Sequence, residues 1–546
     1  MRFADRWSVR EFPDAQKCEP FDSATPFVIH ASLVRGLRRL VVDRSSAVFV
    51  AVWCALTVAA LVPVWHQRML PMLDTPDHLA LARAWHSYGD PSYRIAESYV
   101  LRVRLVPYLL FYGLLNVLSY VVTLETANKL VLSAYLILFP LSVLSLARAL
   151  GRSGWLALGA FALAFNPGWI YGFASYLLGT CFLYFGWAAL LRFVDGGRPR
   201  AAVALLVCSL LVYFSHVMAW ALFGLGCIAL LVLSARVWRR ALVAAALLVP
   251  SLVLAIRAIV QERREHAYMT HGDGFSATWT GPAGSLTEFP KRVLELFPGS
   301  LDMWMLALLA ATTLALLLVA RRRPLPAPGA LPRLLTLLGV LAAAYVALPY
   351  SIKQPMSWWY VAPRLPALMA PLLLLLPPVE LTWRRAGWVA PFVVAAVVLP
   401  TALTIRYSDF NRRNLGFMRL VDRLPRAAKT LVLARGLIYG DAESSGDPAS
   451  SAPVYWHFMS WPMALKGGFS PYLFDQGIPV QPRPGLPYYN VAKTDGIDAR
   501  TAPEFDWYLV HQYFGDPLAD DRRLSAEATI GEWTLYRRIA PMSDEP

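Results

Sequence analysis

The chain has 546 residues, of which 57% are hydrophobic and only 16% are charged. This composition is too apolar for a soluble multidomain protein and predicts a polytopic membrane protein. The 51 basic and 36 acidic residues give a net charge of +15, and the basic residues gather in short clusters at the ends of apolar runs. We interpret this charge as a determinant of membrane topology, so the expected partner is the lipid bilayer and no nucleic acid.

The N-terminal residues 1–45 are polar and end in an arginine cluster directly before the first apolar run. Because basic segments stay in the cytoplasm, we expect a cytoplasmic N-terminus followed by an uncleaved first span. Further apolar runs approach the length of roughly 20 residues that a span requires. The runs cover 46–66, 105–123, 128–147, 154–170, 174–193, 201–215, 217–234, 241–260, 301–320, 331–349, 365–383 and 387–405. They predict a mainly α-helical membrane domain over 46–405 with about 11–12 transmembrane helices.

At one place the positions of the basic clusters disagree with the number of predicted spans. Three full spans before Arg148 would put this residue on the external side, so we expect 105–123 or 128–147 to be a half-span. The longer loops 67–104 and 261–300 and the region 406–546 then share the external face. In a bacterial inner membrane that face is the periplasm.

The region 406–546 changes abruptly to a polar composition with many turn residues. Residues 408–424 have the apolar spacing of a helix that stops before a proline. Strands are predicted at Thr430–Ala434, Trp507–Val510 and Trp533–Tyr536. We therefore expect a small C-terminal α/β domain in the periplasm.

The first external loop opens with the motif LPMLDTPDHLALARAW at 70–85. One interpretation is structural, since Asp74 could cap a helix that begins near Pro76 and Asp77 would favour its positive end. A cap needs only one acidic residue, however, and here two flank a proline with His78 adjacent, close to the membrane. We favour a functional role, because carboxylates near lipid have shifted pKa values and can act as bases.

These three residues suit the transfer of a sugar from a phosphate to an acceptor. Asp74 is the first choice for the general base because it lies nearer the span, and Asp77 is the second. His78 could orient a carboxylate, bind the phosphate, or help to hold a divalent cation of unknown identity.

Three segments carry a resemblance to known proteins: LDTPDHLALARAW, GFASYLLG at 172–179 and YFSHVMAW at 213–220. They are similar to segments of poorly characterised bacterial membrane proteins, and the layout resembles the GT-C class of membrane glycosyltransferases. The resemblance implies a polyprenyl-phosphate-linked sugar donor, a periplasmic acceptor that is a glycan, lipid or protein, and a first-loop acidic base, here Asp74 or Asp77. The WWDYG-type motif of oligosaccharyltransferases and the Asp-Glu pair of protein O-mannosyltransferases are both missing.

A lipid phosphate requires cations at the external surface, and the arginine fork suits phosphate oxygens better than lysine. Arg364 in WWYVAPRLPALMAP is the best candidate, followed by Lys353 in the same loop. His216 interrupts an apolar stretch and is either a satisfied helix break or a residue lining a substrate cavity. Weaker candidates, for which anchoring at the membrane interface is the better interpretation, are Arg102, Arg104, Lys291 and Arg292.

The loop 261–300 contains His266, His271 and Asp273, whose spacing is not a recognised metal pattern. Loops of this length are often functional, so a substrate lid is one expectation. Two rivals to the enzyme hypothesis remain: a transporter or flippase of a lipid-linked substrate, and a non-catalytic subunit that keeps the fold.

Overall fold

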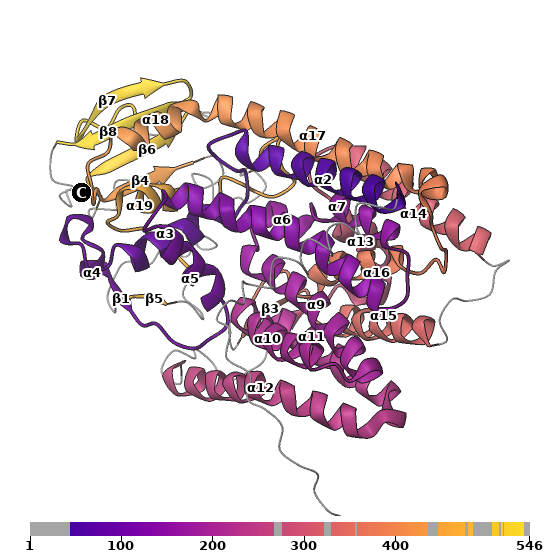
Figure 1. The fold of residues 1–546 in the computed structure, drawn as a ribbon. Helices are drawn as coiled ribbons and strands as arrows, with labels where there is room; N and C mark the ends of the chain where they lie inside the picture. The colour runs from indigo at the N-terminus through magenta and orange to yellow at the C-terminus, as the bar shows by residue number, and fades with distance from the viewer. Residues whose placement is uncertain are drawn as a thin grey trace, which may run out of the picture. The chain divides into compact units, whose positions relative to one another are not determined.

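A computed structural model describes residues 44–266, 276–320, 329–354, 358–434, 446–474, 479–483, 505–512, 515–516 and 518–539. Nearly all of the predicted cytoplasmic segment 1–45 lies outside these residues. Most of the described chain is helical, and its strands form three small sheets (Figure 1). This confirms the predicted class, a mainly α-helical chain with many apolar helices and a mixed α/β part near the C-terminus.

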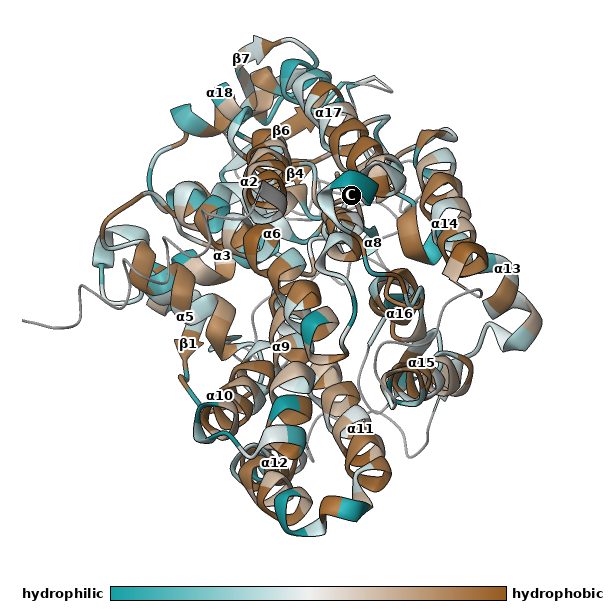
Figure 2. Ribbon diagram, turned by 45° about the vertical axis from the view of Figure 1, so that its right-hand side comes forward, coloured by the Kyte–Doolittle hydropathy of each residue, from teal (hydrophilic) through white to brown (hydrophobic). Residues whose placement is uncertain are grey.

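Seven helical stretches of the described chain are long and apolar enough to cross a membrane. Their helices are α2 (Arg44–Trp65), α6 (Leu124–Ala149), α9 (Ala174–Gly196), α12 (Trp238–His266), α14 (Leu301–Ala320), α15 (Ala330–Ala347) and α17 (Ala390–Arg413). Four shorter apolar helices are α5 (Leu109–Leu118), α10 (Pro199–Ser215), α11 (Val217–Leu233) and α16 (Leu365–Leu374). Figure 2 shows α11, α15 and α16 as mostly hydrophobic along their length. Together these helices account for eleven of the twelve predicted apolar runs.

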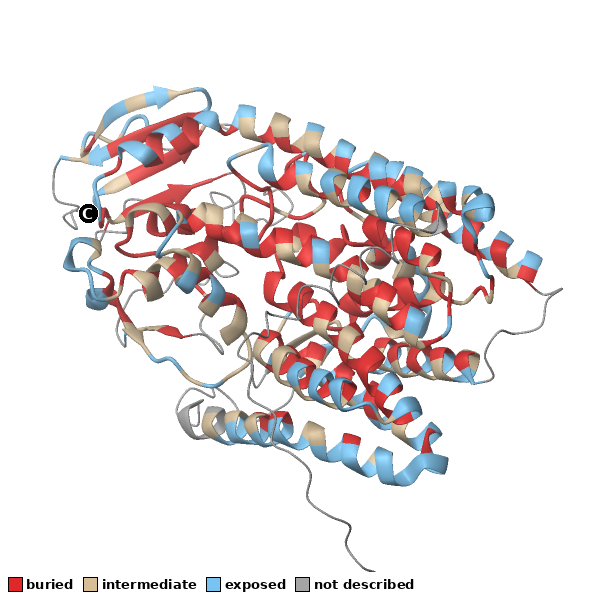
Figure 3. Cartoon of the chain, viewed as in Figure 1, coloured by how far each residue is buried: buried red, intermediate tan, exposed pale blue. Residues whose placement is uncertain are grey.

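The core of the helical part is built around α9, which packs against α6, α10 and α11. In its most apolar 18-residue stretch 83% of the residues are buried, against 17% for α12, and Figure 3 shows the exposed surface of α12. Small residues let these helices approach closely. A Cβ atom on Gly186 would lie 2.5 Å from the Phe223 ring, and one on Gly226 would lie 2.5 Å from the Trp187 ring.

The predicted span 154–170 is wrong as a continuous helix. It consists of η2 (Gly154–Gly159), α7 (Ala160–Leu163) and α8 (Pro167–Tyr171). The break falls at Asn166, which is extended and accepts a hydrogen bond from the Gly168 amide at 2.9 Å. The physical cause is Pro167, since a residue before proline is disfavoured in the helical conformation.

Two other runs are shorter than predicted. Helix α5 has ten residues, a length of about 15 Å, which is half of the hydrocarbon core. A half-span was expected in either 105–123 or 128–147, and α5 in the first run is the short helix, whereas α6 in the second has 26 residues. Helix α16 ends at Leu374 and not near 383, because Pro377 and Pro378 follow it.

The C-terminal region contains a four-stranded sheet of order β4-β6-β8-β7. Its strands are β4 (Thr430–Leu433), β6 (Trp507–His511), β7 (Leu524–Ile530) and β8 (Trp533–Arg538), with β4 and β6 parallel and the other pairs antiparallel. The three predicted strands are confirmed, and β7 was not predicted. The predicted helix 408–424 is divided at Asn414 between the end of α17 and α18 (Leu415–Arg423), and α18 packs on β7 and β8.

The C-terminal region is closely joined to the first external loop. Strand β1 (Tyr99–Leu101) pairs antiparallel with β5 (Val480–Pro482). Helix α19 (Trp461–Lys466) packs against α3 (Thr75–His86) (Figure 1). Segments more than 350 residues apart in the sequence therefore pack side by side in this part of the protein.

The described residues of the predicted loop 261–300 lie mostly in helices and a strand. It holds the end of α12, strand β2 (Ser276–Thr278) and helix α13 (Gly281–Leu294), and β2 pairs with β3 (Ser351–Gln354). His271 and Asp273 lie outside the described residues, as does the side chain of His266. The substrate lid expected here stays a prediction.

Candidate functional site

The acidic motif lies where the first external loop enters α3. The backbone amides of Leu73 and Asp74 donate to the carbonyls of Ile170 and Tyr171, both at 3.0 Å. Gly172 makes this contact close, since it has φ +80° and a Cβ atom there would lie 3.0 Å from the Asp74 nitrogen. The turn after α8 therefore fixes the position of Asp74.

The side chains do not support the interpretation of the motif as a helix cap. Asp74 occupies the N-cap position of α3, but its carboxylate makes no capping hydrogen bond. Pro76 fits the first turn, as expected. Asp77 is fully buried in that turn, and its carboxylate contacts His457 of the C-terminal region.

The partner of both carboxylates is His457, a buried residue just before η7 (Phe458–Ser460). Its Nδ1 atom lies 2.7 Å from Asp77 Oδ2, and its Nε2 atom lies 3.7 Å from Asp74 Oδ1. The Ser460 hydroxyl donates to the other oxygen of Asp77. His457 was not predicted from the sequence, where its local signal is a histidine among aromatic residues in the segment VYWHFMSW.

Burial and neighbouring charges set the protonation of this cluster. Burial, together with the Asp77 charge, raises the pKa of Asp74 to about 7, against the opposing effects of His457 and Arg364. Burial alone would lower the pKa of His457, but Asp77 and Asp74 outweigh it and raise that pKa above its ordinary value. The site therefore favours a charged His457 and an Asp74 that titrates near neutrality.

His78 lies beside this cluster and points elsewhere. Its Nδ1 atom is 2.8 Å from the Tyr112 hydroxyl, and the rings of Phe111 and Phe474 lie against it. Burial and the nearby His457 lower the pKa of His78 to about 3. It is therefore a neutral imidazole, which can donate or accept a hydrogen bond but supplies no positive charge to a phosphate.

Arg364 and His216, both proposed as substrate ligands, are buried and in contact. Arg364 Nη1 lies 3.1 Å from His216 Nε2, and its Nη2 donates to the Trp359 carbonyl at 3.2 Å. The guanidinium carbon lies 3.9 Å from the centre of the Phe173 ring. The Arg364 Nε atom is buried and has no hydrogen-bond partner among the described residues.

Two tyrosines near Arg364 have the left-handed backbone conformation that non-glycine residues rarely adopt. They are Tyr108 (φ 74°) and Tyr360 (φ 58°), two of four such residues in the described chain. The Tyr108 ring packs against His216, and the Tyr360 hydroxyl accepts from Arg292 at 3.2 Å. Such outliers often gather at functional sites.

The remaining cation candidates lie apart from Arg364 or have other partners. Lys353 is exposed on β3, and no contact in the described part of the chain joins it to Arg364. Arg292 pairs with Glu288 at 3.2 Å and packs over Tyr350 and Tyr360. Arg102 and Lys291 are exposed.

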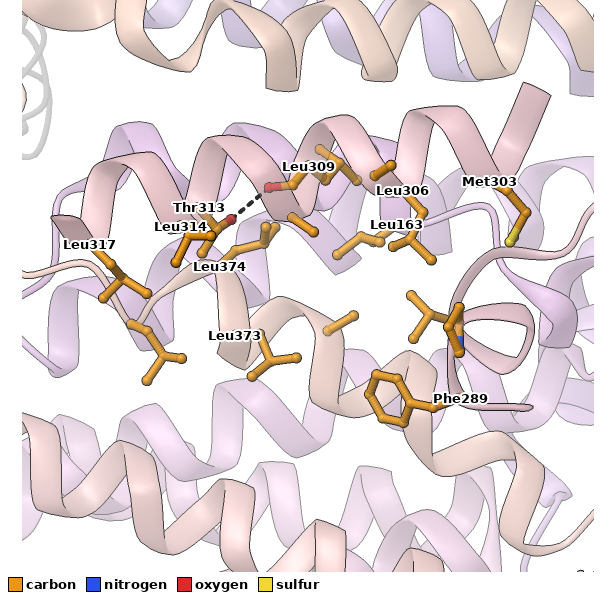
Figure 4. A pocket seen from close by; sticks show the side chains of 16 residues that line it. Leu163, Phe289, Met303, Leu306, Leu309, Thr313, Leu314, Leu317, Leu373 and Leu374 are labelled. Carbon is orange, nitrogen blue, oxygen red and sulfur yellow. Dashed lines mark hydrogen bonds between the residues drawn. The ribbon is translucent and has the colours of Figure 1, made fainter. Parts of the chain in front are cut away.

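An apolar groove of about 550 Å³ runs between α13, α14 and α16 (Figure 4). Its lining is almost entirely aliphatic, with Phe289 at one end and Leu317 toward the other. The Thr313 hydroxyl, a polar group of the lining, is already bonded to the Leu309 carbonyl at 2.8 Å. Such a lining suits a hydrocarbon chain.

No group of three or more His, Cys, Asp or Glu side chains with metal-binding geometry occurs among the described residues. Asp74 and Asp77 contact His457, not His78, so a cation held by the predicted Asp/Asp/His set would require His78 to turn from Tyr112. The divalent cation stays a prediction.

No protein-family model matches the chain, and no curated protein matches it significantly. Among solved structures it is similar to ArnT from Cupriavidus metallidurans, in crystal structures bound to undecaprenyl phosphate and in the apo state. The identities are 12% and 13%, and the TM-score is 0.49 for both. The alignments cover 91% and 92% of this chain and 99% and 100% of that chain, so the similarity extends over nearly the full length of both.

Proposed function

We propose that this protein is a membrane glycosyltransferase that moves a sugar from a polyprenyl-phosphate donor to an acceptor at the external face of the bacterial inner membrane. The observation that carries the proposal is the pairing of two buried sites within electrostatic range of each other. One holds Asp74, a carboxylate that titrates near neutrality, and the other holds Arg364, whose Nε atom has no partner in the described part of the chain.

Of the two carboxylates, we assign the base to Asp74. The Oδ1 atom of Asp77 accepts from the Ser460 hydroxyl, and its Oδ2 atom lies 2.7 Å from His457 Nδ1. Among the described residues, the carboxylate of Asp74 has only the longer contact with His457 at 3.7 Å, so it can accept a proton. Its pKa of about 7 suits a general base at neutral pH.

The Arg364 side has the chemistry of an anion site. His216 Nδ1 accepts a hydrogen bond from the Met218 amide at 3.1 Å, so a neutral His216 carries its proton on Nε2. That atom faces Arg364 Nη1 at 3.1 Å, and two donors then confront each other. A phosphate oxygen between or beside them would accept from both, as well as from the unpartnered Nε.

The reaction follows from the two sites. The bond between the sugar C1 atom and the phosphate oxygen breaks, and its electron pair leaves with the phosphate, which Arg364 and His216 stabilise. The acceptor oxygen forms the new bond to C1 and gives its proton to Asp74. Catalysis then rests on positioning and on electrostatic stabilisation in a site with little water.

The groove supports a lipid-linked donor. Ala370, one of its lining residues, follows Arg364 by six residues, a rise of about 9 Å along the helix. A phosphate held by Arg364 would therefore carry its polyprenyl chain within reach of the groove. The aliphatic lining supplies the apolar surface that such a chain requires.

The experiment is a glycan and glycolipid profile of cells that lack the protein, complemented with wild type, Asp74→Asn or Glu97→Gln. Glu97 is the matched control, an exposed acidic residue of the same loop whose pair with Arg94 is also exposed. We expect wild type and Glu97→Gln to restore a glycosylated product, and Asp74→Asn to reach the membrane at normal abundance without restoring it.

Two results would contradict the proposal. Full restoration by Asp74→Asn would indicate a non-catalytic subunit. Accumulation of the intact lipid-linked precursor on the cytoplasmic side, in cells that lack the protein, would indicate a transporter or flippase.

A further inference from the structure

His457 has a carboxylate oxygen at each of its two ring nitrogens. Asp77 lies at Nδ1 and Asp74 at Nε2, from opposite ends of the first turn of α3. A neutral imidazole has a single N–H, so it would present a lone pair to one of the two carboxylates. Only the imidazolium can donate toward both.

We propose that His457 is a positioning residue of the catalytic base: held as a cation by Asp77, it stabilises the ionised form of the buried Asp74. The C-terminal region therefore supplies part of the active site. This inference rests on the proposed function, in which Asp74 is the base.

The contacts of Asp77 explain why it acts as the anchor of His457. Asp77 is fully buried, its Oδ1 atom accepts from Ser460, and its Oδ2 atom lies 2.7 Å from the imidazole. It also lies in the first turn of α3, where the helix dipole favours negative charge. Asp77 thus fixes the position of His457 and favours its charged form.

The other charged and titratable groups around the pair agree with this assignment. Arg364 acts on Asp74 in the same direction as His457, since both favour the carboxylate. His78 is neutral and held by Tyr112. The buried hydroxyls of Tyr99 and Tyr112 interact electrostatically with the Asp77 carboxylate. Two anions, Asp74 and Asp77, are thus balanced by the cations His457 and Arg364.

Several bonds hold the C-terminal region on the first loop and so place His457. Arg83 of α3 donates to the Ala464 carbonyl at 3.0 Å, and the Gly468 amide donates to the Tyr93 carbonyl at 2.8 Å. The Ser470 amide donates to the Tyr99 hydroxyl at 3.1 Å. The imidazole itself packs against the rings of Tyr472 and Phe474. Docking of this kind restrains a side chain as a binding site requires.

The test is the pH dependence of product formation by His457→Gln in membranes of the deletion strain, which supply the native donor and acceptor. Without the cation, the pKa of Asp74 rises, so the acid limb moves to higher pH. We expect a loss of about tenfold or more at pH 7 that recovers toward wild type near pH 9, since each pH unit changes the ionised fraction about tenfold. Asp77→Asn should move the acid limb in the same direction.

The matched control is His511→Gln. His511 is also buried in the C-terminal region and has one carboxylate near it, Glu532 at 3.0 Å. It contacts neither Asp74 nor Asp77, so its replacement should leave the pH profile unchanged in shape. An equal loss for His457→Gln at every pH would show a structural role and overturn the inference.

A second measurement does not depend on activity. Infrared spectra of purified protein at pH 7 should show a stronger protonated-carboxyl band in His457→Gln than in wild type, and Asp74→Asn in the same background should remove the increase. An unchanged band would also overturn the inference. The two proposals fail separately: if Asp74→Asn keeps full activity, the proposed base is wrong, whereas if it is inactive and His457→Gln shows no pH shift, only the role of His457 is wrong.

Discussion

The start of α3 and the start of α16 both bury charge, but they satisfy it in different ways. At α3, the carboxylates of Asp74 and Asp77 are matched by His457 from within the chain. At α16, Arg364 faces another donor, His216, and its Nε atom has no hydrogen-bond partner within the described segments. The comparison teaches that the acidic groups are faced by a group of opposite charge, whereas the nearest polar side chain to the Arg364 guanidinium is another donor. This asymmetry is what a base beside a phosphate site requires.

The largest effect is expected from Asp74→Asn, which removes the base and leaves the anion site intact. Transfer should fall by about 10²–10⁴-fold, while binding of undecaprenyl phosphate to the purified protein stays at the wild-type level. Measured product formation and native mass spectrometry give the two readouts. Loss of phosphate binding in this variant would mean that the two sites do not act separately.

Substitutions of Arg364 should instead weaken the binding of the lipid phosphate. Arg364→Gln removes charge-assisted hydrogen bonds worth about 1.5–3 kcal/mol, so undecaprenyl phosphate should bind roughly 10–100-fold more weakly. Arg364→Lys should restore only part of this affinity, because lysine has no planar fork. Lys353→Gln is the control, since Lys353 is exposed, and it should change binding little. The hypothesis fails if the Lys353 change weakens binding as much as the Arg364 change.

A smaller effect is expected from filling the groove. Ala310 lines it, whereas its neighbour Ala311 on α14 does not. Ala310→Phe should raise the KM for the lipid-linked donor several-fold with little change in kcat, as expected for a loss of uniform binding. Ala311→Phe should leave both constants near wild type. Equal effects of the two substitutions would remove the groove from the account.

The smallest effect concerns stability. The pKa of Asp74 is raised from its ordinary 3.8 to about 7, so the folded state binds more protons than the unfolded state between these values. The free energy of unfolding then falls as the pH rises through this range. Asp74→Asn should therefore raise Tm above wild type at pH 8, by about 4 °C, and the difference should shrink toward pH 5. A Tm that drops below wild type at pH 8 would contradict the raised pKa.

Much of the fold was predictable because it depends on patterns that are local in the sequence. Apolar runs long enough to span a bilayer predicted the helices, and alternating or compact apolar stretches predicted three strands of the C-terminal sheet. The run 154–170 failed because composition alone does not show how Asn166 and Pro167 divide it. Strand β7, LSAEATI, was missed because its alternate positions hold small alanines that give a weak signal.

The candidate site was predictable only in part, for a similar reason. Asp74 and Asp77 lie in one short motif, and Arg364 and His216 stood out as charged or polar residues in apolar surroundings. The partner of the carboxylates, His457, lies 380 residues beyond Asp77, and its role depends on the docking of α19 against α3. No local pattern contains that information, which comes from tertiary packing.

The central claim is that the basic site at Arg364 binds the phosphate of a lipid-linked donor beside Asp74. The most direct measurement is an experimental structure of the protein with undecaprenyl phosphate. The account predicts phosphate oxygens within hydrogen-bonding distance of Arg364 Nε and His216 Nε2, with the lipid chain directed toward the groove between α14 and α16. A phosphate held elsewhere, with Arg364 and His216 still in direct contact and unliganded, would contradict it.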